Sequence, residues 1–489
     1  MSESFYITTA IPYVNAKPHL GHVLEWFQAD VLARLARQAG KDVAFVAGAD
    51  ENSLKNVQAA EKAGKNTQAW LDEYAGLFEQ AYQDLNISLT SFRRGSDQKL
   101  HWPGVQELWK KCQPNIYKKT YTGLYCVGCE AFYTPEELID GNCPEHMTKP
   151  ELVTEENYFF QLSKYQDEIL RLIKSNELKI TSEQFRSEML SFVEHGLEDF
   201  SISRSKDRGR GIGVPVPNDD AQVMYVWFDA LSIYLTAIGW GYDQEIWQKY
   251  WPADVHVIGK GINRFHSVYW IGMLLAAGLP TPKAISVHGY ITADGQKMSK
   301  SLGNVIDPFE LVTQYGLEPI RYYLLKCIPT HGDGDFSYER FRNVYNADLA
   351  NGIGNLCSRV AKLCEKTSLE NEVVDPQQAL TATSLLNPAQ KEYYLSQKAV
   401  LLEQFELDKT LDLIKTTFID ALDAYLATEK PWQLPEEKAH VILQNAVATL
   451  LFAASELEPF LPKTALTIHD HFAQTHIGAF PGLFPRLKE

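Results

Sequence analysis

The fold is indicated by residues 5–46, which read FYITTAIPYVNAKPHLGHVLEWFQADVLARLARQAGKDVAFV. An apolar run at 5–8 precedes a polar connection, a segment of helical periodicity at 23–37 that ends at Gly40, and a second apolar run at 43–46. Strand, helix and strand in this order are typical of parallel strands joined by a crossover helix. The stretch therefore predicts a parallel α/β sheet.

The same order of elements returns later in the chain. An apolar run at 255–258 is followed by a helical segment at 263–277 and by another apolar run at 285–287. We therefore expect residues 1–112 and 222–288 to be the two halves of one doubly wound, Rossmann-like domain.

Three further regions differ from these halves in composition. Residues 113–221 are rich in Cys, Pro and turn residues with little alternation of strand and helix, so we interpret them as an insertion that splits the sheet domain. Residues 345–489 carry Leu and Ala at helical spacing and predict an all-α helix bundle. Residues 289–344 connect the sheet domain to that bundle.

Composition and charge describe an ordinary globular chain. Of the 489 residues, 45% are hydrophobic and 22% are charged, which excludes wholesale disorder. The net charge of -16 means that a polyanionic partner must be held by a local basic patch. No secretory signal is recognised, and polar Gln444 and Thr449 interrupt the apolar segment at 439–455, which favours an amphipathic bundle helix over a membrane span. We expect a cytoplasmic protein with no membrane partner.

Two pairs of metal-binding residue types lie in the insertion. Cys126 and Cys129 form a C-x-x-C pair, and Cys143 and His146 form a C-x-x-H pair. Two such knuckles supply four ligands to a tetrahedral zinc ion and leave no position for water, so the spacing predicts one structural Zn²⁺. The alternative is four reduced, unligated side chains in a loop.

Polar and small residues fill the connection between the first strand and its helix. In an open α/β sheet this carboxyl-end crevice binds ligands, and a helix N-terminus favours phosphate. His19 and His22 are three residues apart and can both face such a ligand, while Gly21 leaves room for a flat ring. Taken alone the motif is weak, because two histidines here are equally well explained as loop or core residues.

A second motif strengthens the phosphate interpretation. Residues 294–304 read DGQKMSKSLGN and predict a flexible loop in which Lys297 and Lys300 can reach one phosphate chain. Cations placed where charge builds on a leaving pyrophosphate stabilise the transition state, and a mobile loop can close after ATP enters. The alternative is a solvated turn that happens to carry lysines.

Together, HLGH at 19–22 and KMSKS at 297–301 resemble the signature pair of class I aminoacyl-tRNA synthetases. Other stretches resemble the methionyl-tRNA synthetase family in particular, nearly end to end: Pro12-Tyr13, Asn157 to Phe160, Tyr225 to Ala230, Gly259-Lys260, Arg264 to His266 and the cysteine knuckles. The resemblance implies a catalytic domain in two halves, a zinc-binding connective insertion, a stem-contact region at 289–344 that bears KMSKS, and an anticodon-binding bundle.

The resemblance implies ATP-dependent activation of L-methionine to methionyl-adenylate and its transfer to the 3'-terminal ribose of methionine tRNA. Mg²⁺ would accompany ATP. No additional C-terminal module is recognised after the bundle, so a monomer is expected. The implied catalytic residues are His19, His22, Lys297 and Lys300, and the implied ATP-binding residues are these four with Gly21, Met298 and Ser299.

The resemblance also implies a methionine site. Its expected members are Ile11, Tyr13, Asp50, Trp227, Ala230, Leu231, Tyr234, Ile262, Phe265 and His266. Asp50 would receive the ammonium group, and Tyr234 and His266 would contact the sulfur, which packs favourably against aromatic rings. Without the resemblance, Asp50 has a helix N-cap as its alternative interpretation, and the stripe from Trp227 to Tyr234 is more often a core face than a pocket.

For the bundle, the resemblance implies anticodon contacts from Asn355, Arg359, Pro431 and Trp432. Asn355 and Arg359 lie four apart and so share a helical face. Ordinarily such a Trp would be core and such polar residues solvated surface. The sequence departs from the family pattern at Asn52, Ser53, Phe200, Leu231 and Gly261, of which several fall around the expected methionine site.

Two alternatives stay open at this point. One is a class I ligase for another aliphatic or sulfur-containing amino acid, although the roughly 110 residues of the insertion are too few for a large editing domain. The other is a catalytically silent RNA-binding relative, against which the intact motifs argue. ATP–pyrophosphate exchange with a panel of amino acids separates all three.

Overall fold

The computed structural model describes residues 3–128, 131–145, 147–298, 304–367, 383 and 385–488, without the side chains of residues 131 and 297. The chain divides into two compact units. The first contains the residues up to Pro18 and Leu35–His288, and the second contains His19–Arg34 and the residues from Gly289 onward.

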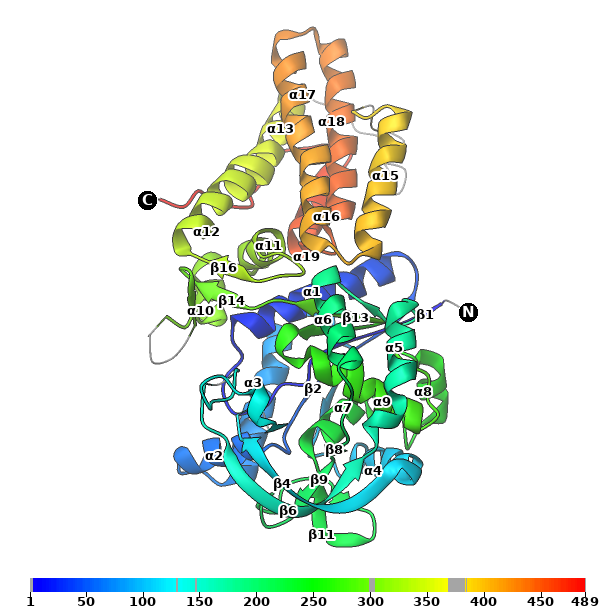
Figure 1. The fold of residues 1–489 in the computed structure, drawn as a ribbon. Coiled ribbons are helices and arrows are strands. Elements are labelled where there is room, and N and C mark those ends of the chain that lie inside the picture. Colours follow the sequence, from blue (N-terminus) through cyan, green and yellow to red (C-terminus); the bar gives the residue numbers. More distant parts are fainter. Residues whose placement is uncertain are drawn as a thin grey trace. The chain divides into compact units, whose positions relative to one another are not determined.

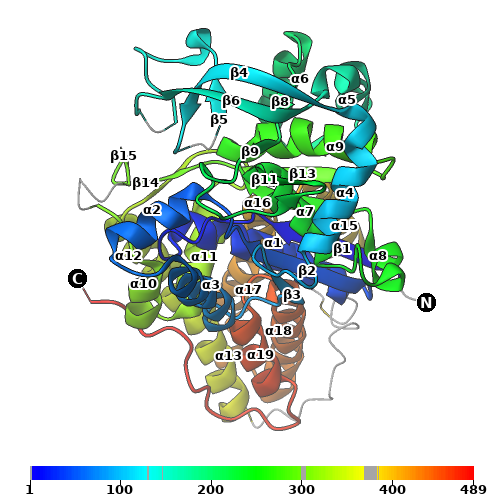
Figure 2. The same cartoon turned by 90° about the horizontal axis from the view of Figure 1, so that it is seen from below.

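The first unit is built on a six-stranded sheet in the order β3-β2-β1-β12-β13-β7, with every neighbouring pair parallel. Five of its strands are β1 (Ser4–Thr9), β2 (Asp42–Ala49), β3 (Ser91–Arg94), β12 (Val255–Gly259) and β13 (Ala284–His288), of which β3 forms one edge. From β1 the chain builds outward to β3 on one side and later to β13 on the other (Figure 2). The predicted doubly wound sheet is confirmed, and its switch point lies between β1 and β12.

The expected insertion contains more regular structure than we predicted. Strands β4 (Ile116–Cys126) and β6 (Glu151–Phe160) form a long antiparallel pair (Figure 2), flanked by β5 (Ala131–Tyr133) and β8 (Phe200–Ser201). Helices α5 (Gln166–Lys174) and α6 (Glu183–Glu194) follow. Much of β4 and β6 is exposed and carries Lys, Thr and Glu, so these strands lack the apolar runs that mark buried ones.

Strand β7 (Lys179–Ile180) shows that this segment is joined to the central sheet. It pairs in parallel with β13, opposite Ala284 and Ile285. The sheet therefore takes its edge strand from within residues 113–221. Two residues are too few to give a strand signal in sequence, and only the pairing identifies them.

The segment that carries Trp227, Ala230, Leu231 and Tyr234 is helical as expected, and this helix α7 (Val226–Thr236) is buried along its whole length. The expected helix at 263–277 begins with a 3-10 turn at Lys260–Ile262 and a π-helical turn at Phe265–Tyr269 before α9 (Trp270–Ala276). The unit's other elements are α2 (Leu54–Lys62), α3 (Thr67–Asp84), α4 (Trp102–Cys112), α8 (Gln244–Tyr250), β9 (Ser203–Ser205), β10 (Pro215–Val216) and β11 (Asp219–Met224).

The second unit combines a small sheet with a helical region. The sheet contains β14 (Ile291–Ala293), β15 (Gln296–Lys297) and β16 (Gly334–Phe336). The helices include most of α1 (Leu20–Gln38), α10 (Pro308–Tyr315), α11 (Leu317–Cys327), α12 (Tyr338–Val344), α13 (Asn355–Lys366), α15 (Pro388–Glu403), α16 (Leu407–Ile414), α17 (Ala421–Glu429), α18 (Glu436–Leu457) and α19 (Pro462–Phe472). Helices α13, α16, α17 and α19 pack around α18, which confirms the predicted helical C-terminal region (Figure 1).

Helix α18 is the one helix in the described part of the chain that is long and apolar enough to cross a membrane. Of its most apolar window, 72% is buried inside the protein, as in the core helix of a bundle. Most of the helix is buried, and Gln444 is among its exposed residues, which agrees with the predicted amphipathic bundle helix. Its polar Asn445 and Thr449 are accommodated by hydrogen bonds with Thr383.

Candidate active site

Four of the residues predicted to bind methionine form an aromatic cluster in the first unit, namely Trp227, Tyr234, Phe265 and His266. The rings of Trp227 and Phe265 stack with centroids 4.0 Å apart and planes 4° apart. The His266 ring meets Trp227 edge-on at 6.2 Å. Ile11, Tyr13 and Ile262 pack partly buried against the same core as Trp227, Leu231, Tyr234 and Phe265, and Ala230 is buried in α7. A wide π-helical turn carries Phe265 and His266, a feature frequent at functional sites.

Tyr234 and His266 form a buried hydrogen-bonded pair. Nδ1 of His266 lies 2.9 Å from the carbonyl of Ile262, which can only accept, so this nitrogen carries the proton. Nε2 therefore accepts from the Tyr234 hydroxyl at 2.9 Å. Burial lowers the pKa of His266 to about 4, so the imidazole is neutral at physiological pH. The pair presents uncharged polar atoms within an aromatic wall.

A second buried histidine supports Tyr234 from β12. His256 stacks on the Tyr234 ring with centroids 4.4 Å apart, and its Nδ1 lies 2.7 Å from Oγ1 of Thr8, its register partner in β1. Burial holds the pKa of His256 well below its usual range. We did not predict a role for His256 from the sequence, where its only signal was a polar residue inside an apolar strand.

Asp50 lies just past the carboxyl end of β2 and is 4% exposed. Its backbone N–H donates to the carbonyl of Pro12 at 2.9 Å, and its backbone pairs with Tyr13 in an isolated parallel bridge. The N-cap of the following helix α2 is Ser53, whose hydroxyl accepts from the Lys55 N–H. Asp50 is therefore not the helix cap that we held open, and Ser53, a departure from the family pattern, has this structural role.

In the second unit, His19 and His22 cap the N-terminus of α1 reciprocally. Nδ1 of His19 accepts from the backbone N–H groups of Gly21 and His22 at 3.1 and 3.4 Å, and Nδ1 of His22 accepts from the His19 N–H at 3.2 Å. The rings stack with centroids 3.7 Å apart. This is the capping-box pattern with imidazoles in place of hydroxyl and carboxylate. Because backbone N–H groups only donate, each neutral ring carries its proton on Nε2.

Gly21 is required by this close approach. A Cβ at this position would lie 3.1 Å from the His19 ring, tighter than ordinary van der Waals contact. We predicted that Gly21 leaves room for a flat ring of the ligand, whereas the ring it accommodates in this structure is that of His19. The glycine thereby permits the histidine pair to close over the helix end.

The expected lysine loop begins as a β-hairpin. Asp294 and Gly295, with φ of 49° and 74°, form the turn between β14 and β15, so our prediction of a flexible loop is wrong for residues 294–297. Adjacent residues with positive φ are typical of tight hairpin turns. Oδ1 of Asp335 accepts from the Gly295 N–H at 2.7 Å and fixes the turn.

Within the KMSKS motif, Lys297 lies in β15 and pairs with Thr292 in β14. Met298 follows Lys297 and is half-buried. The Lys297 side chain, together with Ser299 and Lys300, lies outside the described residues.

The predicted anticodon residues come together on the helical region. The Arg359 guanidinium lies 5.1 Å from the centroid of the Trp432 ring, and its NH1 is 2.7 Å from Oδ1 of Asp423. Trp432 is 49% exposed, which excludes the core alternative. Asn355 is exposed at the start of the same helix α13, and Pro431 is buried beside Trp432.

Two of the four predicted zinc ligands lie in the described part of the chain. The Cys126 and Cys143 thiols are 2% and 0% exposed. Thr148 contacts both segments, since its hydroxyl lies 3.9 Å from Sγ of Cys126 and its carbonyl accepts from the Cys143 N–H at 2.9 Å. Cys129 and His146 lie outside the described residues, and within the described ranges no cluster of three or more metal-binding side chains is found. The zinc insertion therefore stays a prediction.

Comparison with known proteins extends these observations to nearly the whole chain. A family model described as "tRNA synthetases class I (M)" matches residues 5–149 and 146–361. A methionine–tRNA ligase of Thermotoga maritima is 40% identical over 474 residues, which cover 94% of this chain and 74% of that protein. One of Brucella suis is 39% identical over 481 residues, with 96% and 92% covered. The chain belongs to the methionyl-tRNA synthetase family.

A solved structure of this family has nearly the same fold. Methionyl-tRNA synthetase of Mycobacterium tuberculosis, in complex with methionyl-adenylate, matches with a TM-score of 0.89 and 35% identity over 99% of this chain and 100% of that one. Its free form matches with a TM-score of 0.84. The α/β Rossmann-like synthetase fold with a helical C-terminal region is thereby established.

The departures from the methionyl-tRNA synthetase pattern have identifiable surroundings. Asn52 is buried, and its amide bonds to the Gly95 carbonyl and to Asp229. Phe200 stacks on Tyr269 with centroids 4.4 Å apart, and Leu231 is fully buried in α7. We did not predict from the sequence that Asp229 and His101, which contact each other, lie beside the methionine-site candidate Asp50 and its neighbour Asn52. Their link spans more than a hundred residues, so no local pattern could have indicated it.

The buried His266 of this synthetase predicts an acid-sensitive fold. Its folded pKa is about 4 against an ordinary 6.5, so between these values the unfolded chain binds a proton that the folded chain excludes. Its contribution to the unfolding free energy is therefore present above pH 6.5 and falls by about 2 to 3 kcal/mol on acidification to pH 4.5. Urea unfolding of the wild type and of His266→Gln at pH 7.5 and 4.5 measures this. Equal losses in both chains would contradict it.

Proposed function

We propose that this chain activates L-methionine with ATP to methionyl-adenylate and transfers the methionyl group to the 3'-terminal ribose of methionine tRNA. This is the reaction of the family to which it belongs. The observation that carries the proposal is the match of 99% of the chain to a synthetase solved with methionyl-adenylate. The alternative of a silent RNA-binding relative loses ground, because methionine–tRNA ligases are about 40% identical over most of the chain.

In the proposed mechanism, the methionine carboxylate attacks the α-phosphorus of ATP and pyrophosphate leaves. We assign the Nε2–H groups of His19 and His22 as donors to phosphate oxygens, since Nδ1 of each ring accepts from the backbone, and Lys297 and Lys300 add positive charge. Donors fixed in advance cost no reorganisation when charge develops on the transferring phosphate. Mg²⁺ bound to ATP would supply further positive charge to the triphosphate. Gly21, Met298 and Ser299 complete the proposed ATP site.

The proposed methionine site selects a neutral, unbranched thioether. The stacked Trp227 and Phe265 offer a polarizable surface to sulfur, and the uncharged Tyr234–His266 pair offers polar contact without a buried charge. Asp50 binds the ammonium group. The remaining contacts are assigned to Ile11, Tyr13, Ala230, Leu231 and Ile262, which surround the same core.

ATP–pyrophosphate exchange with a panel of amino acids tests the function. We expect exchange that depends on methionine and is weak with norleucine, valine, isoleucine and cysteine. Exchange that prefers another amino acid would assign the chain to a different class I specificity. No exchange with any amino acid would support the RNA-binding alternative. Aminoacylation of methionine tRNA then tests the second step.

For tRNA, we propose that Asn355, Arg359, Pro431 and Trp432 read the anticodon. Single-stranded bases are recognised by stacking on aromatic rings and by hydrogen bonds to their edges. The half-exposed Trp432 offers a ring face, and Arg359 and Asn355 offer donors on one helical face beside it. The net charge of -16 makes such local contacts necessary.

Replacing Trp432 by alanine is expected to raise the KM for tRNA about tenfold or more, because base stacking on an aromatic ring contributes about 1–3 kcal/mol. Methionine-dependent pyrophosphate exchange should stay within about twofold of the wild type. Tyr393→Ala, which removes another exposed aromatic ring from the helical region, is the matched control. Equal effects of the two substitutions on the KM for tRNA would remove Trp432 from the anticodon site.

We further propose that Cys126, Cys129, Cys143 and His146 hold one structural Zn²⁺. The two buried thiols that the structure describes have the donor chemistry of such a site, and Thr148 connects their segments. Bound zinc would tie the two knuckles together. A monomeric, cytoplasmic protein is also proposed.

Metal analysis of the purified chain is expected to find about one zinc per molecule, because two knuckles supply four ligands to one ion. Cys143→Ser should lower that content strongly. Cys112→Ser, at a buried thiol on helix α4, should leave it unchanged. A wild-type chain without zinc would favour the unligated loop.

A further inference from the structure

Asn52 connects the proposed ammonium-binding residue to a buried polar network. Its backbone N–H donates to Oδ1 of Asp50 at 3.2 Å. Its side-chain amide donates to the carbonyl of Gly95 at 3.0 Å and to Oδ2 of Asp229. Asn52 is 3% exposed, so both side-chain contacts are made away from water. One residue thus holds the Asp50 carboxylate while its own side chain is fixed from helix α7.

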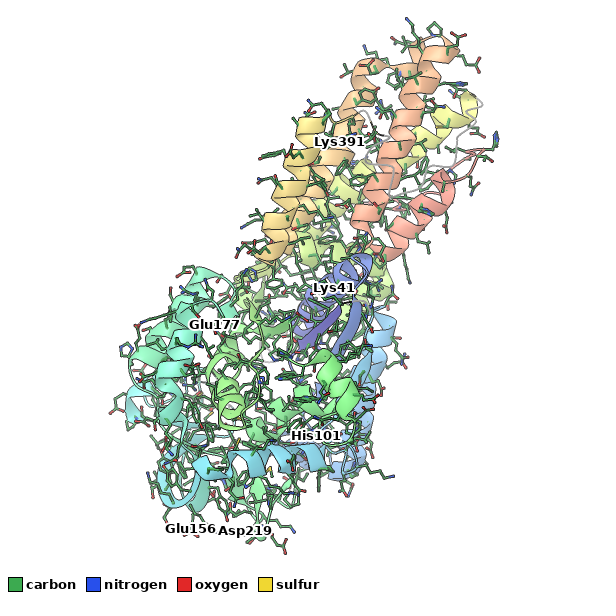
Figure 3. All side chains as sticks on the ribbon, turned by 90° about the vertical axis from the view of Figure 1, so that its right-hand side faces the viewer. Lys41, His101, Glu156, Glu177, Asp219 and Lys391 are labelled. Carbon is green, nitrogen blue, oxygen red and sulfur yellow. The ribbon has the colours of Figure 1, made fainter. Side chains whose placement is uncertain are left out.

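Asp229 is held in turn by a residue from another element. Its Oδ1 lies 2.6 Å from Nε2 of His101, and Nδ1 of His101 lies 2.8 Å from Oγ1 of Thr236. His101 is fully buried and stands directly before helix α4 (Figure 3). Both oxygens of Asp229 therefore have N–H partners. Rotation of the carboxylate or of the Asn52 amide would leave buried polar groups unpaired, which is costly.

Arg204 in β9 fixes the same residue from its carbonyl side. Its guanidinium NH2 donates to the backbone oxygen of Asn52 at 2.8 Å, and Arg204 is 5% exposed. The backbone N–H of Asn52 faces Asp50, its carbonyl faces Arg204, and its amide faces Gly95 and Asp229. Asn52 is thus held by four different residues, through its backbone N–H, its carbonyl and its side-chain amide. A residue that only connects a strand to a helix does not require so many hydrogen bonds.

We propose that Asn52 is a positioning residue that sets the Asp50 carboxylate for the ammonium group of the substrate, and that Asp229 and His101 hold Asn52 in place. The inference rests on the proposed role of Asp50 in binding methionine. None of the three positioning residues is assigned a contact with the substrate. Their effect is confined to the amino group, so they should change recognition of methionine and leave ATP binding alone.

Asn52→Ala keeps Asp50 and the backbone but removes the connection to Asp229. In pyrophosphate exchange it is expected to raise the KM for methionine about 10- to 100-fold, the range for a hydrogen bond to a charged group, with the KM for ATP within about twofold. The competitive inhibitor 4-(methylthio)butanoate is the analogue of methionine without the amino group. The preference for methionine over this inhibitor should fall by a similar factor. Asn52→His, whose imidazole N–H can reach a carboxylate, should restore part of it.

Ser232→Ala is the matched control. It removes a buried hydrogen bond on the same helix α7, from the Ser232 hydroxyl to the Phe228 carbonyl, and should keep the wild-type preference. If circular dichroism shows that Asn52→Ala does not fold, Asp229→Asn is the second test, because it keeps the size of the side chain. We expect the same fall in the preference for methionine over 4-(methylthio)butanoate. Folded variants with the wild-type KM and preference would overturn the positioning role. A wild-type chain without methionine-dependent exchange would instead overturn the proposed function.

Discussion

Replacement of His22 by alanine is expected to slow methionyl-adenylate formation about 100- to 1,000-fold, the usual loss when one fixed donor to developing charge is removed. The KM for methionine should stay within about twofold, because no methionine contact is assigned to His22. Rapid-quench measurement of adenylate formation, with methionine and ATP varied separately, gives both quantities. Equal losses in rate and in methionine affinity would contradict a role confined to the transition state.

The capping role of His22 needs its own control, because Nδ1 of its ring also stabilises the helix end. In His22→Glu, the carboxylate can accept from the His19 N–H as in an ordinary capping box, but it places negative charge where phosphate is proposed to bind. This variant should fold with near wild-type stability and be at least as inactive as His22→Ala. His476→Ala, at an exposed histidine, should match the wild type in both respects.

Replacement of Arg321 by alanine is expected to lower the free energy of unfolding by about 3–5 kcal/mol. Arg321 is 0% exposed, and its NH2 lies 2.6 Å from Oδ2 of Asp30 on helix α1. Its Nε and NH2 also donate to the carbonyls of Phe460 and Pro459 at 2.6 and 2.9 Å. Removal of the guanidinium takes away one of the two arginines that pair with the buried Asp30 carboxylate and leaves the Arg34 pair. It also removes the hydrogen bonds to the carbonyls of Phe460 and Pro459. Urea unfolding monitored by tryptophan fluorescence measures the loss.

The matched control lies on the same helix. Lys326 in α11 pairs with Asp412 at 2.8 Å, but the Asp412 side chain is 53% exposed. Exposed ion pairs contribute about 0–1 kcal/mol, so Lys326→Ala should hardly move the midpoint. If the two substitutions cost the same, the buried Asp30–Arg321 pair does not stabilise helix α1 in the way we infer.

Several features followed from local sequence because their causes are local. The parallel sheet was predictable because apolar runs at 5–8, 43–46, 255–258 and 285–287 correspond to its buried strands. Helix α1 was predictable from its periodicity and from Gly40, whose φ is 80°. The edge strand β7 and the long pair β4–β6 were not predictable, because two residues or a polar surface give no apolar pattern.

The candidate site likewise has features that depend on local sequence and features that depend on distant contacts. The sequence by itself determined which residue types stand after β1, after β2 and around 227–234 and 262–266, and the resemblance named their roles. Only the tertiary structure decided that both imidazoles of the HLGH motif accept at Nδ1, that His266 is neutral, and that Asn52, Asp229 and His101 form one network. The protonation state, the tautomer and the hydrogen-bond partner of a side chain depend on its burial and on atoms from distant segments of the chain. The spacing of residues along the sequence specifies neither the burial nor these distant atoms.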